Sequence, residues 1–245
     1  MPRPTGYEPL STLKPIAEDV WISDGGWIRF YGLPFPTRMT VIRLPGSRLW
    51  VHSPIEPAKP LLDSLAKLGE VKYLIAPNWI HYAWITEWQK LFPEAVTWAS
   101  PGVVDRARSR GTSLFVDHEL IDLAPQAWQE HIQQRVADSK LHKEVIFFHT
   151  STRTLVLTDL IENFERKFVP WWMRPLLKLG QVGAPDGRTP RDIATSFRRS
   201  PKHLTELIET MITWDPERVV ISHGRWFEKN GTAEIRRAFR TELKR

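Results

Sequence analysis

The chain has 245 residues, with 34 Lys and Arg against 28 Asp and Glu, and it contains no cysteine. The absence of cysteine excludes disulfides, thiolate-bound zinc, iron–sulfur clusters and a cysteine nucleophile, so any metal would be held by His, Asp, Glu or Asn. The net charge of +6 favours anionic partners, but the basic residues are scattered among acidic ones, so nucleic acid is not indicated as a partner.

No apolar run approaches the length that crosses a bilayer, and the N-terminal residues lack the apolar core of a secretory signal. A chain of this length also commonly folds around one core. We therefore expect a single cytoplasmic domain over residues 1–245, without a transmembrane segment.

Short apolar runs separated by turn residues mark the first part of the chain as a β-meander. Strands are predicted over 20–22, 27–31, 39–44 and 48–52, with turns at Gly25-Gly26, at residues 34–36 and at Pro45-Gly46. A β-α-β pattern follows, with a helix over 61–68 and a buried strand over 71–75. Further elements are a helix over 81–91, a strand over 95–99 and a helix starting at 103–107.

The second half of the chain predicts a β-hairpin and then helices. The hairpin strands cover 144–149 and 154–160, and the second strand is expected to end at Asp159. A helix over 204–212, a strand over 218–222 and a helix over 233–243 complete the pattern. Between them, the Trp- and Pro-rich stretch 164–201 predicts helical pieces in a connecting excursion rather than sheet.

Several strand ends resemble motifs of the metallo-β-lactamase family. Residues 39–44 and 49–54 resemble its early hairpin, with Ser53 near the place of an acidic turn residue. Residues 74–81 occupy the place of its HxHxDH loop, in which His81 falls on the last histidine. Ala76 and Asn78 replace the first two histidines, and Ile80 replaces the aspartate.

Two further stretches resemble later motifs of that family. Residues 155–160 resemble the strand that ends in a metal-bridging aspartate, here Asp159, and residues 219–224 resemble the final strand-His-Gly, here with His223. Lys140 lies near the place of the remaining histidine, and His142 is two residues away. The resemblance extends from about residue 15 to 240 and is shared with a branch of unknown function. It implies an α/β fold, an αββα sandwich of two mixed β-sheets flanked by helices.

The resemblance implies a reduced metal site. Ala76 and Asn78 remove two nitrogen ligands, so a dinuclear centre is not expected, whereas His81, Asp159 and His223 remain as ligands for at most one Zn or Fe ion. Asn78, as a weak oxygen ligand, and His142 are additional candidates. The alternative is a site without an ion, in which Asp159 hydrogen-bonds the two histidines.

Three functions follow from these alternatives. The leading hypothesis is a metallo-hydrolase-like protein that uses an acidified water against an unknown small-molecule ester, phosphoester or amide. The same ligands also fit a mononuclear iron redox protein. The third hypothesis is a non-catalytic binding or scaffold protein whose metal centre has decayed.

Other conspicuous residues are interpreted more simply. Trp171 and Trp172 are predicted to form a lid or a homodimer contact rather than a membrane-surface contact, because Pro175 breaks the segment. His149 is expected at the surface or capping a turn. Ordinary packing or exposure is expected for the three histidines without a partner at ligand spacing, His52, His131 and His203.

Overall fold

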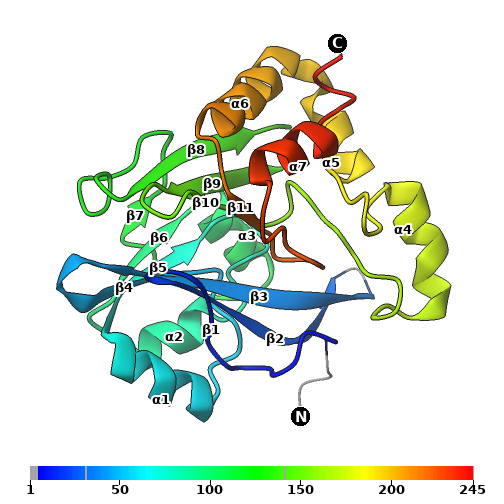
Figure 1. Ribbon diagram of the computed structural model, residues 1–245. Helices are drawn as coiled ribbons and strands as arrows, with labels where there is room; N and C mark the ends of the chain where they lie inside the picture. The colour runs from blue at the N-terminus through cyan, green and yellow to red at the C-terminus, as the bar shows by residue number, and fades with distance from the viewer. Residues whose placement is uncertain (1–4, 31, 141, 245) are drawn as a thin grey trace. The chain divides into compact units, whose positions relative to one another are not determined.

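The computed structural model describes residues 5–30, 32–140 and 142–244. Contacts divide the chain into two compact units, of which the first ends at Ile121 and the second begins at Asp122. Each unit has its own sheet and its own helices, labelled in Figure 1.

The first unit contains a seven-stranded sheet in the order of the chain, β1-β2-β3-β4-β5-β6-β7. Strands β1 to β4 pair antiparallel, whereas β4 to β7 pair parallel, so the sheet is mixed. The strands are β1 (Lys14–Ala17), β2 (Val20–Phe30), β3 (Leu33–Leu44), β4 (Arg48–His52), β5 (Glu70–Ala76), β6 (Val96–Ala99) and β7 (His118–Glu119).

Three helices cover one face of this sheet: α1 (Lys59–Leu68), α2 (Ile85–Leu91) and α3 (Val103–Ser109). Alternate residues of β3 and β4, Met39, Val41, Leu49 and Val51, point into the same core as the buried faces of the helices. The helices contribute Leu61, Leu65, Ile85, Trp88, Val103 and Ala107. The predicted β-α-β pattern is thus confirmed.

The predicted turns at Gly25-Gly26 and at residues 34–36 are wrong. Strand β2 continues through the glycines with a register shift between Asp24 and Trp27, and Pro34 and Pro36 lie within β3. Strand β4 pairs with β3 only from Thr40 onward, so the earlier part of β3 is an edge on that side, where proline is tolerated. A short 3-10 helix, η1 (Pro45–Ser47), makes the next turn as expected.

The second unit contains a four-stranded mixed sheet in the order β11-β10-β9-β8. Strands β8 (Ile132–Asp138), β9 (Lys143–His149) and β10 (Thr154–Val156) pair antiparallel, and β11 (Arg218–Val220) pairs parallel to β10. Strand β8 was not predicted, because polar residues dominate its sequence IQQRVAD even though Ile132, Gln134 and Ala137 are buried.

Helices pack on this sheet through a second core. The predicted helical excursion is confirmed: it consists of η2 (Trp171–Met173), α4 (Arg174–Gly180), α5 (Arg191–Ser196) and η3 (Phe197–Arg199). Helices α6 (Pro201–Thr213) and α7 (Gly231–Ala238) lie side by side in Figure 1. Leu207, Ile208, Met211 and Ile235 of these two helices pack with Leu155 and Val219 of the sheet. No helix of the described residues is long and apolar enough to cross a membrane.

Three local features differ from the sequence prediction, and the first two affect the candidate site. Helix α2 begins at Ile85, so His81 lies in the loop before it. Strand β10 ends at Val156, before Asp159, because the backbone there turns toward a buried carboxylate described below. Pro175 does not break its segment but occupies the first turn of α4, where its missing N–H has no helical partner to lose.

Candidate functional site

Asp159 and His223 form the centre of the candidate site in the second unit. Asp159 follows β10 and His223 follows β11, two adjacent parallel strands that pair Val156 with Val220. The carboxyl ends of parallel strands lie at the same edge of a sheet, and there His223 Nε2 lies 2.9 Å from Asp159 Oδ1. Both side chains are buried, and Phe164 stacks against the His223 ring.

Glu144, in β9, fixes the turn that carries Asp159. Its carboxylate accepts the backbone N–H groups of Thr158, Asp159 and Leu160 at 2.7, 2.9 and 3.0 Å. Charge-assisted bonds of this kind are about twice as strong as neutral ones, and Glu144 is fully buried. The turn therefore has its conformation set by a side chain of the same unit.

His142 is the second partner of Glu144. Its Nε2 lies 2.9 Å from Oε2 of Glu144, and the backbone of His142 is held by Ser139, whose hydroxyl donates to its carbonyl. Burial alone lowers the pKa of His142, but the hydrogen bond and charge of Glu144, with the charges of Asp159 and Asp192, raise it above its usual value. The bond to Glu144 thus favours the charged form of His142 more than burial alone would allow.

His142, Glu144 and Asp159 each offer a ligand atom, and these atoms lie within 4.8 Å of one another. Both Glu144 oxygens, however, already accept hydrogen bonds, one from Thr158 and the other from Asp159, Leu160 and His142. This cluster is therefore a hydrogen-bonded support, and His142 acts through Glu144 on the turn.

Glu162 is a second buried carboxyl group close to this cluster. Burial raises its pKa well above the usual value, and the charges of Asp159 and Asp192 raise it further. The neutral form is favoured because one more buried negative charge near Asp159 would be repelled. Burial and the neighbouring carboxylates therefore shift Glu162 toward its protonated form.

In the first unit, His81 is oriented by two neighbouring side chains. The Asn78 Oδ1 atom accepts the N–H groups of Ile80 and His81 at 2.8 and 3.0 Å, and Ser53 Oγ lies 2.7 Å from His81 Nδ1. The Asn78 oxygen, a candidate ligand by sequence, is engaged in closing the loop. Asn78 is thereby a positioning residue for His81.

His52 lies at the end of β4, next to Ser53. Its ring stacks on Trp50 at a centroid distance of 5.5 Å, as expected for a packed histidine. Burial lowers the pKa of His52 to about 3, and the nearby charge of His81 contributes to the decrease. His52 is thus neutral throughout the physiological range.

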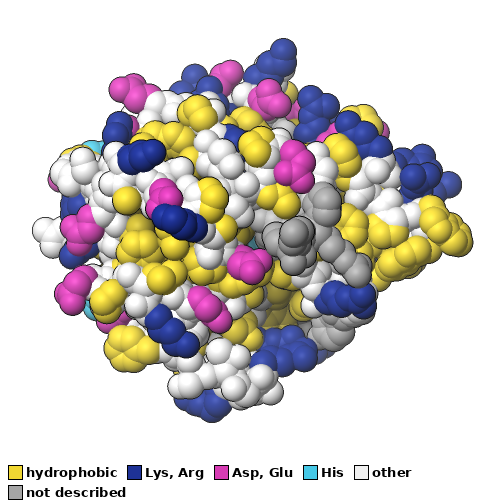
Figure 2. Space-filling view, turned by 90° about the horizontal axis from the view of Figure 1, so that it is seen from below, with side chains coloured by type: hydrophobic (Ala, Val, Ile, Leu, Met, Phe, Trp, Pro, Cys, Tyr) yellow, Lys and Arg dark blue, Asp and Glu magenta, His cyan; other side chains and the backbone are white. Residues whose placement is uncertain are grey.

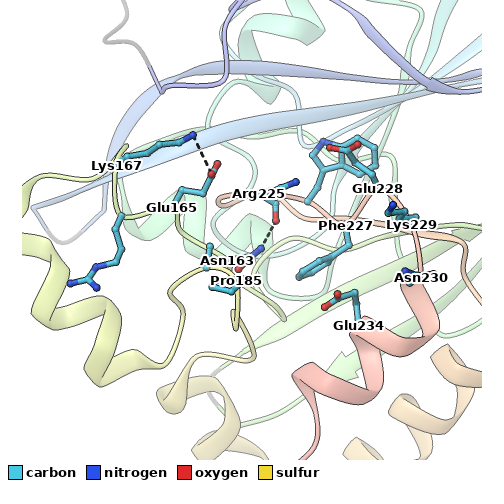
Figure 3. A pocket seen from close by; sticks show the side chains of 13 residues that line it. Asn163, Glu165, Lys167, Pro185, Arg225, Phe227, Glu228, Lys229, Asn230 and Glu234 are labelled. Atoms are coloured by element: carbon cyan, nitrogen blue, oxygen red, sulfur yellow. Dashed lines mark hydrogen bonds and ion pairs between the residues drawn. The ribbon is translucent and has the colours of Figure 1, made fainter.

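A cavity of about 630 Å³ opens in the second unit, and its lining residues include Asn163, which bonds the His223 backbone. Asn163, Glu165 and Lys167 line one side of it, and the segment from Phe227 to Asn230 lines the other (Figure 3). Asn163 connects the cavity to the pair, since its N–H donates to the His223 carbonyl and its amide donates to the Arg225 carbonyl. The volume lies within the range of small-molecule pockets.

The cavity wall is rich in charged residues, with cations outnumbering anions. It contains Arg166, Lys167, Arg225 and Lys229 against Glu165, Glu228 and Glu234. Lys167 pairs with Glu165 at 3.5 Å, and Glu234 pairs with Arg237 at 2.6 Å. Arg166, Arg225 and Lys229 are exposed, so the cavity can attract an anionic small molecule.

The remaining histidines are distributed as packing and surface residues. His149 is buried rather than at the surface, and its Nδ1 lies 2.8 Å from Thr152 Oγ1 in the hairpin turn, so the turn-capping expectation holds. His203 accepts the N–H of Asp138, and His131 is partly buried. Glu144, Glu162 and Asn163 were not identified from sequence. Glu144 directly precedes the apolar run of residues 145–148, but its partners are mainly backbone N–H groups, which leave no sequence pattern.

The residues present fit a single metal ion better than a pair of ions. Asp159 offers a buried carboxylate and His223 a buried imidazole at one sheet edge, and carboxylate oxygen and imidazole nitrogen atoms suit zinc or iron. Of the residues at the family's other ligand places, Ala76 has no donor atom and the Asn78 oxygen is engaged. A second ion has too few ligands.

Comparison with known proteins identifies relatives by sequence and by structure. The family described as "Domain of unknown function (DUF4336)" matches residues 18–176. No curated protein matches the chain in sequence. The chain is similar in structure to a metallo-β-lactamase from Pontibacter korlensis, with a TM-score of 0.63, 12% identity and coverage of 95% of this chain and 99% of the other.

Two further solved structures give the same result. The metallo-β-lactamase from Hirschia baltica has a TM-score of 0.64, 13% identity and coverage of 94% and 96%. The metallo-β-lactamase FIM-1 from Pseudomonas aeruginosa, in its mono-zinc form, has a TM-score of 0.62, 11% identity and coverage of 95% of each chain. Identities this low establish the fold alone. The chain has the metallo-β-lactamase fold, and the resemblance inferred from its strand ends is confirmed.

Proposed function

Since the chain belongs to the DUF4336 family of domains of unknown function, and has the metallo-β-lactamase fold, we propose that it is a metallo-hydrolase-like protein with at most one metal ion. The proposal assigns His81, Asp159 and His223 as the ligands. It requires the loop of His81 to supply an imidazole to the Asp159–His223 pair.

The observation that carries the proposal is the buried Asp159–His223 pair, whose atoms are 2.9 Å apart at the ends of two adjacent strands. Carboxylate and imidazole from neighbouring strand ends are a common pair of metal ligands. FIM-1, one of the structurally similar proteins, is described in a mono-zinc form, so the fold itself accommodates a single ion in that protein.

The hydrogen bonds around His81 support its assignment. Ser53 Oγ lies 2.7 Å from its Nδ1, so the other ring nitrogen, Nε2, would coordinate the ion. A ligating histidine usually bonds a polar group through its second ring nitrogen, which fixes the ring orientation. Asn78 adds to this by closing the loop around His81.

The chemistry follows from these residues. A zinc or iron ion held here would lower the pKa of a bound water toward neutrality and so favour hydrolysis. Glu144 keeps Asp159 in place through the backbone of its turn, and the charge of Asp159 helps to raise the pKa of the buried Glu162 carboxyl group. The cationic cavity binds the substrate, for which we propose an anionic small-molecule ester, phosphoester or amide.

The experiment that tests the proposal is metal analysis of protein purified without chelators. We expect close to one Zn or Fe per chain, and a loss of the bound metal in His81→Ala, Asp159→Asn and His223→Ala. His131→Ala is the matched control, because His131 is a partly buried histidine outside the site. Protein without Zn, Fe or Mn, and without a thermal shift when these metals are added, would contradict the proposal.

Metal identity separates hydrolysis from the redox alternative. Zinc together with hydrolysis of phosphoester or ester test substrates supports the hydrolase. Iron together with oxygen consumption supports a mononuclear redox protein instead.

The Glu144 network favours one second candidate, a non-catalytic binding protein. Glu144 and His142 order the Asp159 turn with hydrogen bonds alone, so the turn needs no ion to keep its shape. This candidate predicts metal-free protein whose cavity still binds anionic small molecules, measured by calorimetry. Loss of such binding in His81→Ala/His223→Ala protein would count against it.

A further inference from the structure

Four large apolar side chains stand out from the surface along η2 and α4. Trp171 is 78% exposed, Leu179 is 65% exposed, and Trp172 and Leu176 are each 44% exposed. We call these four residues the α4 apolar surface. In Figure 2 hydrophobic side chains gather beside Lys and Arg at the right-hand edge, on the side where α4 lies in Figure 1.

The segment carries apolar side chains on two faces, one buried against the protein and one exposed to solvent. Met173 and Leu177, four residues apart, are buried and attach the segment to the protein. Trp172, Leu176 and Leu179 recur at helical spacing on a different face, which is exposed. Met173 and Leu177 thus attach the helix to the protein, and the other apolar face remains in contact with solvent.

Basic residues predominate along this surface. Residues 166–185, bordered by Glu165 and Asp186, contain Arg166, Lys167, Arg174 and Lys178 and no Asp or Glu, and all four cations are exposed. Of these, Lys167 pairs with Glu165 at 3.5 Å. Lys167 lies over the ring of Phe168, with Nζ 4.5 Å from the centroid. Such a combination of exposed indoles, leucines and cations matches an anionic lipid surface, in which indoles sit at headgroup level and cations pair with phosphates.

We propose that the α4 apolar surface, with its four cations, docks the protein on an anionic membrane surface. A lid over the cavity is not supported, because neither Trp171 nor Trp172 lines it. A symmetric homodimer through this surface would bring the cations of two copies together, since a two-fold contact uses the same patch twice. Anionic lipid instead neutralises them.

The experiment is co-sedimentation of the full chain with vesicles. We expect binding to vesicles of equal parts phosphatidylglycerol and phosphatidylcholine, and much weaker binding to phosphatidylcholine alone. Raising the salt from about 0.1 to about 1 M shortens the Debye length from about 10 to about 3 Å and should release most of the protein.

Two double variants test the contribution of each residue type. Trp171→Ser/Leu179→Ser should weaken vesicle binding by more than about tenfold. Arg174→Gln/Lys178→Gln should weaken it by about 25-fold, since each cation near the surface contributes about fivefold. Matched controls are Phe115→Ser/Leu123→Ser, at 69% and 67% exposure, and Lys90→Gln/Arg110→Gln, which are exposed on and after helices of the first unit.

The controls should bind like the wild-type chain. Absence of binding to anionic vesicles would overturn the proposal, and so would an equal loss in the controls. A wild-type dimer in analytical ultracentrifugation that Trp171→Ser/Leu179→Ser converts to monomer would also overturn it, because the surface would then be a self-interface. None of these outcomes depends on bound metal.

Discussion

The Glu144 carboxylate accepts the backbone N–H of Asp159 at 2.9 Å, so the aspartate is held through its main chain by a buried residue of strand β9. The same carboxylate also binds the N–H groups on either side and the His142 ring. One side chain thereby orders the turn between β10 and the following segment.

Glu144→Gln should therefore destabilise the second unit strongly. The amide replaces one acceptor oxygen with an N–H₂ donor that faces backbone N–H groups, and breaking a buried charged pair typically costs about 3–5 kcal/mol. Chemical denaturation measures the change in the free energy of unfolding. Glu206→Gln on α6 is the exposed control and should change that free energy by less than about 0.5 kcal/mol. Equal stability of the two variants would rule out the supporting role of Glu144.

Gly224, directly after His223, has no room for a side chain. Its φ is +95°, and a Cβ there would lie 2.1 Å from the Asn163 carbonyl oxygen. We expect Gly224→Ala to lower the free energy of unfolding by about 3 kcal/mol or more, from the left-handed backbone and the clash together. Urea denaturation of the variant and the parent chain measures the loss.

Gly111→Ala separates these two causes. Gly111 has a φ of +75°, and a Cβ added there would meet nothing within 4 Å, so only the backbone cost of about 1–2 kcal/mol applies. Similar losses for the two variants would show that the close approach to Asn163 is unimportant.

Ser53→Ala should weaken metal binding without removing a ligand. Ser53 Oγ lies 2.7 Å from His81 Nδ1, and loss of such an outer contact commonly lowers metal affinity by about 10–100-fold. Competition with a chromophoric chelator measures the affinity. Ser109→Ala, on an exposed stretch of α3, is the control. An affinity unchanged by Ser53→Ala would argue against His81 as a ligand.

The lowered pKa of His52 predicts that the free energy of unfolding decreases in acid. Its pKa is about 3 in the folded chain because of burial and the charge of His81, whereas an unfolded histidine has its usual value of 6.5. Between these values the unfolded chain binds a proton that the folded chain does not. The stability is complete above pH 6.5 and decreases by roughly 1.4 kcal/mol per pH unit as the pH falls toward 3.

A His52→Gln variant should lose this dependence. Unfolding free energies measured by urea denaturation between pH 6 and pH 4 should fall less steeply in the variant than in the parent chain, by about 1.4 kcal/mol per unit. At pH 8 the two slopes should agree, because histidine is then neutral in both states. Parallel slopes in acid would contradict the shifted pKa of His52.

The fold was predictable wherever one face of an element is apolar. Leu204, Leu207, Ile208 and Met211 give α6 its helical period, and all four are buried. Strand β8 was not predicted because its buried positions include Gln134. The side-chain oxygen of Gln134 accepts a hydrogen bond from the Trp128 indole N–H, and its amide N–H₂ donates to the Leu123 carbonyl. A buried polar residue with side-chain partners leaves no hydrophobic alternation in the sequence.

The site was predictable only in part. Asp159 and His223 could be found because each follows an apolar strand and fits a family motif. Glu144 could not, since its partners are mainly backbone N–H groups, which any residue provides and which no sequence pattern records. The assignment of His81 as a ligand stays a prediction for metal analysis to test.

Asn163 links the wall of the cavity to the backbone beside His223, through bonds to the His223 and Arg225 carbonyls and from the Gly187 N–H. The exposed wall residues Arg166, Glu228 and Lys229 take no part in those bonds. Under the proposed function, selection could exchange the outer charges and alter which molecules enter while Asp159 and His223 keep their spacing. Specificity and chemistry would then evolve separately.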